Sequence, residues 1–166
     1  NLPRGTVENI LTLMESDRAK KLSTLLGYSS DSAGGLMTTE FVSMPDTMAI
    51  EAAIDYIKNQ TREVDTVPYI YIVDDKHKLQ GVTTIRKLLF ADPKETVLKT
   101  VFPTTIYVHL HDSVKEVAFL MDKYKVSAIP VVDENKLLHG IITMDDILSQ
   151  VVAIAWRKRP RKAKGL

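Results

Sequence analysis

The sequence has no cysteine among its 166 residues, and this absence excludes a disulfide framework and any metal site built on thiolates. It also has no apolar run close to the roughly 18 residues that a membrane-spanning helix needs. The first ten residues, NLPRGTVENI, lack the apolar core of a signal peptide. These absences predict a domain of the reducing cytoplasm.

Hydrophobic residues make up 45% of the chain and charged residues 26%, which suits one compact domain or two small ones with a buried core. The net charge of +1 is unevenly distributed, because six basic residues fall in the last ten positions. Without those six the net charge would be about −5, so a mildly acidic body precedes a basic tail. The six are Arg157, Lys158, Arg159, Arg161, Lys162 and Lys164.

The chain contains an internal repeat. Residues 67–89 align without a gap on residues 126–148, at an offset of 59. Within them, GVTTIRKL (81–88) and GIITMDDI (140–147) share a glycine and a threonine but carry charged pairs of opposite sign. A repeat of this length defines the architecture of a fold. The identical positions, numbered in the first copy, are Val67, Ile70, Val73, Asp74, Leu79, Gly81, Thr84 and Leu89.

Both copies predict the same order of elements, β-α-β-β-α. The opening strands are expected at 40–44 and 105–109, two further strands follow in each copy, and the closing helices are expected to begin near Ile85 and Met144. A unit of about 60 residues buries little core alone. We therefore expect an α+β fold in which the two repeats pack face to face as a pseudo-two-fold module.

The first helix of each copy is expected at 47–58 and at 112–124. Ser113 and Glu116 are spaced as a capping box that opens the second of these helices. Each helix is predicted to present one apolar face. These faces are Met48, Ala52 and Tyr56 in the first copy, and Val114, Ala118 and Met121 in the second.

Two tandem units, each with an apolar strand ending in Val-Asp and a Gly-x-x-Thr turn, resemble a pair of cystathionine-β-synthase (CBS) domains over roughly residues 37–155. The segments YSSDSAGGLMTTEF, YIYIVDDKHKLQGVTTIRKLLFADP and SAIPVVDENKLLHGIITMDDIL are similar to the cytosolic part of MgtE-type magnesium transporters. Such transporters continue into transmembrane helices, so the sequence is expected to be an excised piece or a soluble relative. The resemblance implies a helical segment at 1–36, CBS repeats at 37–98 and 99–155, and a basic tail at 156–166.

The resemblance also implies a nucleotide site. CBS pairs commonly bind adenine nucleotides such as ATP or AMP through a Gly-h-x-Thr/Ser-x-x-Asp motif, which the second repeat matches at Gly140, Thr143 and Asp146. An aspartate accepts hydrogen bonds from both ribose hydroxyls, and the threonine hydroxyl assists it. The family packs the adenine ring between two segments, which here are Ala128, Ile129 and Pro130, and Thr104, Thr105 and Ile106.

The first repeat has Gly81 and Thr84 but carries Lys87 in place of the aspartate. Lysine only donates hydrogen bonds, so it cannot hold two ribose hydroxyls in the same way. One competent nucleoside site and one degenerate site are therefore expected. The alternative is that Asp145 and Asp146 are simply first-turn acids favoured by the helix dipole, and that the basic pair is solvated.

Acidic pairs are the candidates for Mg²⁺, which prefers oxygen ligands and keeps several waters. The resemblance implies Mg²⁺ sensing by acidic residues that gather between subdomains and across a dimer. Two of the pairs also fit hairpin turns, where aspartate bonds its own backbone. His109 and His111 raise zinc as an alternative, but without a further ligand two surface histidines are the favoured interpretation. The Mg²⁺ candidates are Asp74, Asp75, Asp133, Glu134 and Asp145.

These observations predict a regulatory binding module rather than an enzyme, because the sequence has no P-loop and no nucleophile in a triad-like context. It is expected to sense adenine nucleotide, Mg²⁺ or both, as a homodimer, and to act on a transmembrane transporter domain or a partner protein at the cytosolic face of a membrane. The alternative is a stand-alone interaction protein whose basic tail contacts RNA or membrane. No specific nucleic-acid site is expected, because no aromatic residue follows Trp156.

Overall fold

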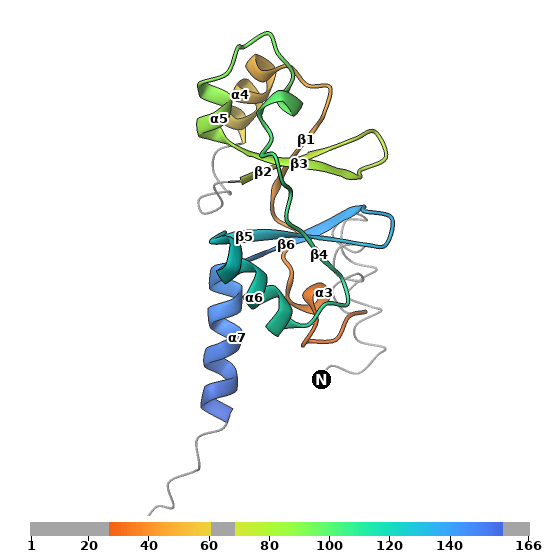
Figure 1. The fold of residues 1–166 in the computed structure, drawn as a ribbon, viewed down its shortest axis with the longest axis vertical. Helices are drawn as coiled ribbons and strands as arrows, with labels where there is room; N and C mark the ends of the chain where they lie inside the picture. Colours follow the sequence, from red (N-terminus) through yellow and green to blue (C-terminus); the bar gives the residue numbers. More distant parts are fainter. Residues whose placement is uncertain (1–26, 61–68, 158–166) are drawn as a thin grey trace, which may run out of the picture.

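The computed structural model describes residues 27–60 and 69–157, and Figure 1 shows them as two similar units, one above the other. Each unit has a three-stranded sheet on the side that faces the other unit and helices on its outer side. The predicted α+β fold with two β-α-β-β-α repeats is confirmed. The helical segment expected at 1–36 lies outside the described residues, except for its last part.

The first unit follows the predicted order of elements. Its strand β1 runs parallel to β2, and β2 runs antiparallel to β3. The ladder between β2 and β3 shifts register between Ile72 and Val73. The elements are β1 (Val42–Pro45), α4 (Ile50–Asn59), β2 (Tyr69–Val73), β3 (Leu79–Thr84), α5 (Ile85–Leu89) and the 3-10 turn η1 (Val97–Thr100). The short helix α3 (Ala33–Leu36) precedes β1 in the chain but packs in the core of the second unit (Figure 1).

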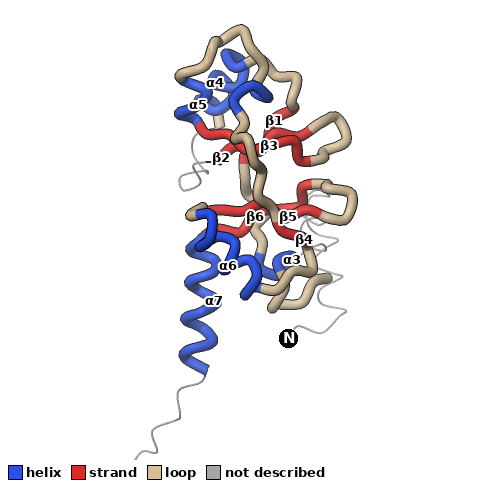
Figure 2. The backbone as a smooth tube through the Cα atoms, in the orientation of Figure 1, coloured by secondary structure: helices blue, strands red, loops and turns tan. Residues whose placement is uncertain are grey.

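The second unit repeats this topology, with the same shift of register between Val131 and Val132. Its last helix, α7, is much longer than its counterpart α5 and extends away from both sheets (Figure 2). The elements are β4 (Val108–His109), α6 (Val114–Tyr124), β5 (Ala128–Val132), β6 (Leu138–Thr143) and α7 (Met144–Arg157).

The predicted helix starts are confirmed. Helices α5 and α7 begin at Ile85 and Met144, directly after the threonine that ends the preceding strand. The capping box at the start of α6 is also present, because the Ser113 hydroxyl accepts from the Glu116 N–H (3.2 Å) and the Glu116 carboxylate accepts from the Ser113 N–H (2.9 Å). These caps satisfy N–H groups that a helix start leaves unpaired.

The predicted apolar face of α4 is wrong in part. Ala52 and Tyr56 are exposed, whereas Ile50 and Ala53 are buried and Ile57 packs against them. The sequence carries apolar residues around much of this helix, and the branched isoleucines face the core instead. The face predicted for α6 is confirmed, since Met121 is buried and both Val114 and Ala118 pack against the same core.

Within the described residues, three hydrophobic clusters hold the two units together. Each unit has one cluster between its sheet and its helices, and the third cluster lies between the two sheets. The hairpin turns also join the sheets, because the Leu79 N–H donates to the Lys136 carbonyl and the Leu138 N–H donates to the His77 carbonyl. The shared cluster consists of Tyr71, Val73, Leu79, Val82, Val132, Leu138 and Ile141, with Phe41, Tyr69, Phe102 and Tyr107 at its edges.

Candidate functional site

Each glycine of the repeated turn lies against a chain segment that passes from one unit toward the other. A Cβ placed on Gly81 would come within 2.7 Å of the Val101 Cβ, and the Phe102 N–H donates to the Val82 carbonyl. A Cβ placed on Gly140 would come within 2.7 Å of the Thr38 carbonyl oxygen. The linker after residue 101 therefore borders the first repeat's turn, while residues 37–38 border the second repeat's turn.

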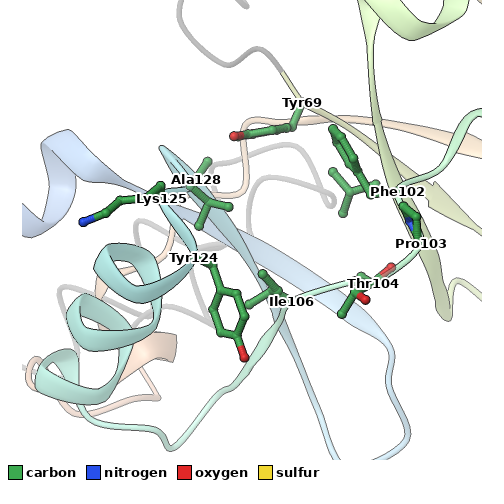
Figure 3. A pocket seen from close by; sticks show the side chains of 11 residues that line it. Tyr69, Phe102, Pro103, Thr104, Ile106, Tyr124, Lys125 and Ala128 are labelled. Atoms are coloured by element: carbon green, nitrogen blue, oxygen red, sulfur yellow. The ribbon is translucent and has the colours of Figure 1, made fainter.

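A cavity of about 450 Å³ opens where this linker crosses between the units. In Figure 3, the rings of Tyr69 and Phe102 lie on one side of it, and Tyr124 and Ile106 lie on the other. This volume falls in the range of small-molecule sites, and the mixture of aromatic, apolar and hydroxyl groups suits a flat heterocycle. The lining residues are Tyr69, Val82, Phe102, Pro103, Thr104, Thr105, Ile106, Tyr124, Lys125, Val126 and Ala128.

The structure divides the predicted nucleotide residues into groups. Thr104, Thr105, Ile106 and Ala128 line the cavity together. The other four do not line it. Ile129 and Pro130 are buried in β5, and Thr143 and Asp146 lie where β6 passes into α7.

The Asp146 carboxylate caps its own helix. Its Oδ2 accepts from the Thr143 N–H (2.9 Å) and from the Thr143 hydroxyl (2.8 Å), and the Asp146 N–H lies 3.3 Å from that same hydroxyl oxygen. Thr143 is the partner of Ala128 across the β5–β6 ladder, so this cap is one strand away from the cavity wall. The capping role agrees with the alternative interpretation of a first-turn acid, and both contacts with Thr143 are made by the same carboxylate oxygen, Oδ2.

Lys87 occupies the corresponding place in the first repeat. Its N–H donates to the Thr84 hydroxyl (3.2 Å), as the Asp146 N–H does to Thr143. Its side chain does not return to the backbone. Instead, the Lys87 Nζ lies 4.2 Å from the centroid of the Phe102 ring, which lines the cavity.

Two of the acidic pairs form the turns of the β-hairpins, as the turn interpretation predicted. Asp74 Oδ1 accepts from the N–H groups of Lys76 (2.9 Å) and Lys78 (2.8 Å). Asp133 Oδ1 accepts in the same way from Asn135 (2.8 Å) and Leu137 (3.0 Å). One oxygen of each carboxylate is therefore engaged in the turn.

The Asp133 carboxylate also meets His139, whose Nε2 lies 2.9 Å from Oδ2. Partial burial of Asp133 opposes its ionisation, but the hydrogen bonds from His139 and from the N–H groups of Leu137 and Asn135 outweigh burial and lower the pKa of Asp133. In the first repeat, the Gln80 amide lies 3.3 Å from Asp74 Oδ2, so a neutral residue takes the place of the histidine there.

A second hollow, of about 570 Å³, lies beside the second hairpin turn. His109 and His111 line it, and each ring packs edge-on against a tyrosine, Tyr107 and Tyr28 respectively. Across residues 27–60 and 69–157, no group of three or more histidine, aspartate or glutamate side chains is placed to hold a metal ion. The Mg²⁺ candidates Asp75, Glu134 and Asp145 are exposed, so none of the candidate pairs forms an enclosed site by itself.

The sequence prediction missed the aromatic residues of the cavity. Tyr69 and Phe102 come from the first unit and the linker after it, and Tyr124 comes from the end of α6. Tyr69 stands one offset of 59 before Ala128, so the repeat itself indicated that the two residues open equivalent strands. No spacing rule indicated that Phe102 and Tyr124 would meet there.

A family model described as CBS domain matches residues 33–94 and 98–153. The magnesium transporter MgtE of Thermus thermophilus is 36% identical over 148 residues, which are 89% of this chain and 33% of the transporter. The chain thus spans about a third of the length of this relative. Within the described residues, no helix is long and apolar enough to cross a membrane.

Two solved structures are similar in fold and in sequence. The cytosolic domain of the Mg²⁺ channel MgtE in complex with ATP superposes with a TM-score of 0.78 at 36% identity, covering 86% of this chain and 58% of that one. The soluble part of a magnesium transporter superposes with a TM-score of 0.82 at 33% identity, covering 93% of this chain and 60% of that one.

Proposed function

Because the chain belongs to the CBS domain family, we propose that it is a regulatory module that binds an adenine nucleotide and controls a magnesium transporter. The observation that carries this proposal is the cavity between the repeats, at the point where one linker passes from the first unit to the second. The ATP bound to the similar MgtE cytosolic domain supports the choice of ligand. Binding, rather than catalysis, is the activity proposed for this chain.

The cavity offers a flat ligand two kinds of contact. The rings of Tyr69, Phe102 and Tyr124 provide stacking surfaces, which tolerate any base because every base has a π face. The hydroxyls of Thr104 and Thr105 provide donors and acceptors at the linker. We place the base among the rings and the sugar toward the linker.

The ribose contact proposed for Asp146 belongs to the opposite cleft. That cleft is bordered by residues 37–38, which cross Gly140 as residues 101–102 cross Gly81. In this proposal, Asp146 keeps its bond to Thr143 through one oxygen and accepts a ribose hydroxyl with the other.

Ligand binding at either cleft would act on the relation between the two units. The linker touches both units. A ligand that binds one relative arrangement of the units more tightly than another therefore shifts the population toward the arrangement that it prefers. The size of that shift is set by the difference between the two affinities. The transporter or partner protein would read the shift at the cytosolic face of the membrane, where the similar MgtE domain lies.

Mg²⁺ is the second proposed ligand, held by acidic residues that meet between subdomains or copies. A ligand that binds only the folded state adds stability. Millimolar Mg²⁺ is therefore expected to raise the melting temperature more than the same ionic strength of NaCl does. An equal melting temperature in both salts would contradict Mg²⁺ sensing but would not affect the nucleotide proposal.

Calorimetric titration with ATP tests the nucleotide proposal. Losing one base–aromatic stack costs about 1–3 kcal/mol, so Tyr69→Ala should weaken binding by roughly tenfold or more. Tyr56→Ala is the matched control, because Tyr56 is 39% exposed on α4 and does not line the cavity. No heat of binding at millimolar ATP would remove the proposal.

A further inference from the structure

The cavity has an uneven distribution of charge. Among the described residues that line it there is no carboxylate, and Lys125 is the one cation. The Lys125 ammonium points away from the cavity in Figure 3 and lies 2.7 Å from Asp122, with its side chain 79% exposed. The Lys125 ammonium is therefore directed away from the cavity and not toward a ligand inside it.

Lys87 is the other cation at this place. It is half-buried, and its ammonium lies over the face of the Phe102 ring at 4.2 Å from the centroid. In the described part of the chain, the ion pairs within 4.0 Å join Lys125 to Asp122 and His139 to Asp133. The Lys87 ammonium therefore has no carboxylate partner there. Lys87 is not itself a lining residue, and its three N–H donors are held beside the cavity by a weak attraction to the ring of Phe102, which lines it.

We propose that Lys87 makes this cavity selective for nucleotides over nucleosides, by donating hydrogen bonds to a phosphate group of the bound ligand. This inference rests on the proposed function and refines it, because it assigns the ligand a required negative charge. An ammonium on a flexible stem meets phosphate as a point charge and can leave the ring of Phe102 when an anion enters. The repeat with lysine is then a phosphate-reading site rather than a degenerate one.

The same geometry explains why the two turns carry charges of opposite sign. In the second repeat, Asp146 accepts from Thr143 and is suited to hydroxyl donors. In the first repeat, Lys87 has only donors and is suited to anionic acceptors. Each cleft thus selects a different part of the same kind of ligand.

Calorimetry with AMP and adenosine tests the proposal, because the two ligands differ only in the phosphate. The parent protein is Asp146→Ala, which removes the ribose contact of the opposite cleft, and Asp146→Asn serves as a second parent. In the parent, AMP should bind at least about tenfold more tightly than adenosine, the ratio expected for a hydrogen bond to a charged group. Adding Lys87→Gln should reduce that ratio by about tenfold, and adding Lys87→Arg should keep most of it.

Lys125→Gln is the matched control, since it removes a cation from the lining and should leave the ratio unchanged. Equal loss of AMP and adenosine affinity in Lys87→Gln would overturn the inference, because Lys87 would then only position Phe102. Tighter AMP binding in Lys87→Gln would also overturn it, because the lysine would be filling the cavity. If the wild type binds AMP and both parents do not, the inference fails while the proposed function survives. If the wild type binds no nucleotide, both fail.

Discussion

The backbone of Thr38 lies against Gly140, and a pair of reciprocal backbone hydrogen bonds joins Thr38 to Ile141, the residue after this glycine. The Thr38 N–H donates to the Ile141 carbonyl (2.8 Å), and the Ile141 N–H donates to the Thr38 carbonyl (2.9 Å). The described glycines have no positive φ, so Gly140 is needed here for its lack of a side chain and not for its backbone freedom. This contact ties the segment that precedes β1 to the last strand of the second unit.

We predict that Gly140→Ala destabilises the module by roughly 1–3 kcal/mol, the usual cost of forcing extra atoms into a packed site. The added Cβ would meet a backbone oxygen at 2.7 Å, which moves only if the two hydrogen bonds to Ile141 move with it. Gly81→Ala should cost less, because the Cβ there meets the side chain of Val101. Urea denaturation measures the free energy of unfolding of both variants, and Gln80→Ala, at an exposed residue beside Gly81, is the control. A Gly140→Ala variant as stable as that control would contradict the packing argument.

The double role of Asp146 leads to a second prediction. Asp146→Ala removes the bonds to Thr143 and should lower stability by roughly 0.5–1.5 kcal/mol, while weakening adenosine binding by about 1.5–3 kcal/mol. Asp145→Ala is the control, because it removes an exposed acid from the same helical turn without touching that cap. Melting curves and calorimetry separate the two effects. A destabilised Asp146→Ala variant with wild-type adenosine affinity would leave Asp146 as a helix cap alone.

The lowered pKa of Asp133 predicts how stability responds to acid. A carboxyl whose pKa is lower in the folded state than its unfolded value of about 3.9 contributes stability above that value. The contribution is lost as the pH falls through the folded pKa. The stability difference between wild type and Asp133→Asn should therefore shrink as the pH falls below about 4. Glu134→Gln, in the same turn, should show no such change. A difference that persists undiminished at pH 2 would contradict the assigned bonds.

Exposed apolar residues on α6 and α7 lead to a prediction about assembly. Phe119 is 64% exposed on α6, and Leu148, Val151 and Val152 are each more than half exposed on α7. We propose that these exposed residues pair two copies of the chain. A glutamate at position 119 would then be costly to bury within the apolar contact. Light scattering at micromolar concentration should give a dimer for the wild type and a larger monomer fraction for Phe119→Glu. Phe90→Glu, at the end of α5, should leave the dimer intact, and a monomeric wild type would remove this proposal.

Much of the fold could be predicted from the repeat. The position of Thr143 at the end of an apolar strand placed the start of α7, and the spacing of Ser113 and Glu116 placed the start of α6. These signals are local, because a cap depends on residues three apart. The core-facing side of α4 was mispredicted at Ala52 and Tyr56, because only the packing of the sheet decides between two apolar stripes.

The candidate site was predicted less completely, because it is formed by residues that are distant in the sequence. The motif placed Asp146 correctly on its helix but joined it to Thr104, Thr105 and Ile106. In the structure the linker crosses beside Gly81, and residues 37–38 cross beside Gly140. The way in which the two sheets face each other decides which segment covers each turn. The sequence pattern does not predict that arrangement.

We propose that an adenine nucleotide occupies the cavity between Tyr69 and Ala128. Photolabelling with 8-azido-ATP, followed by mass spectrometry of the peptides, tests it most directly. We expect label on residues 101–106 and 124–128 that excess ATP prevents, and we expect that labelling to be lost in Tyr69→Ala. Label that ATP competes away only from residues outside the cavity lining, or no competed label at all, would contradict it.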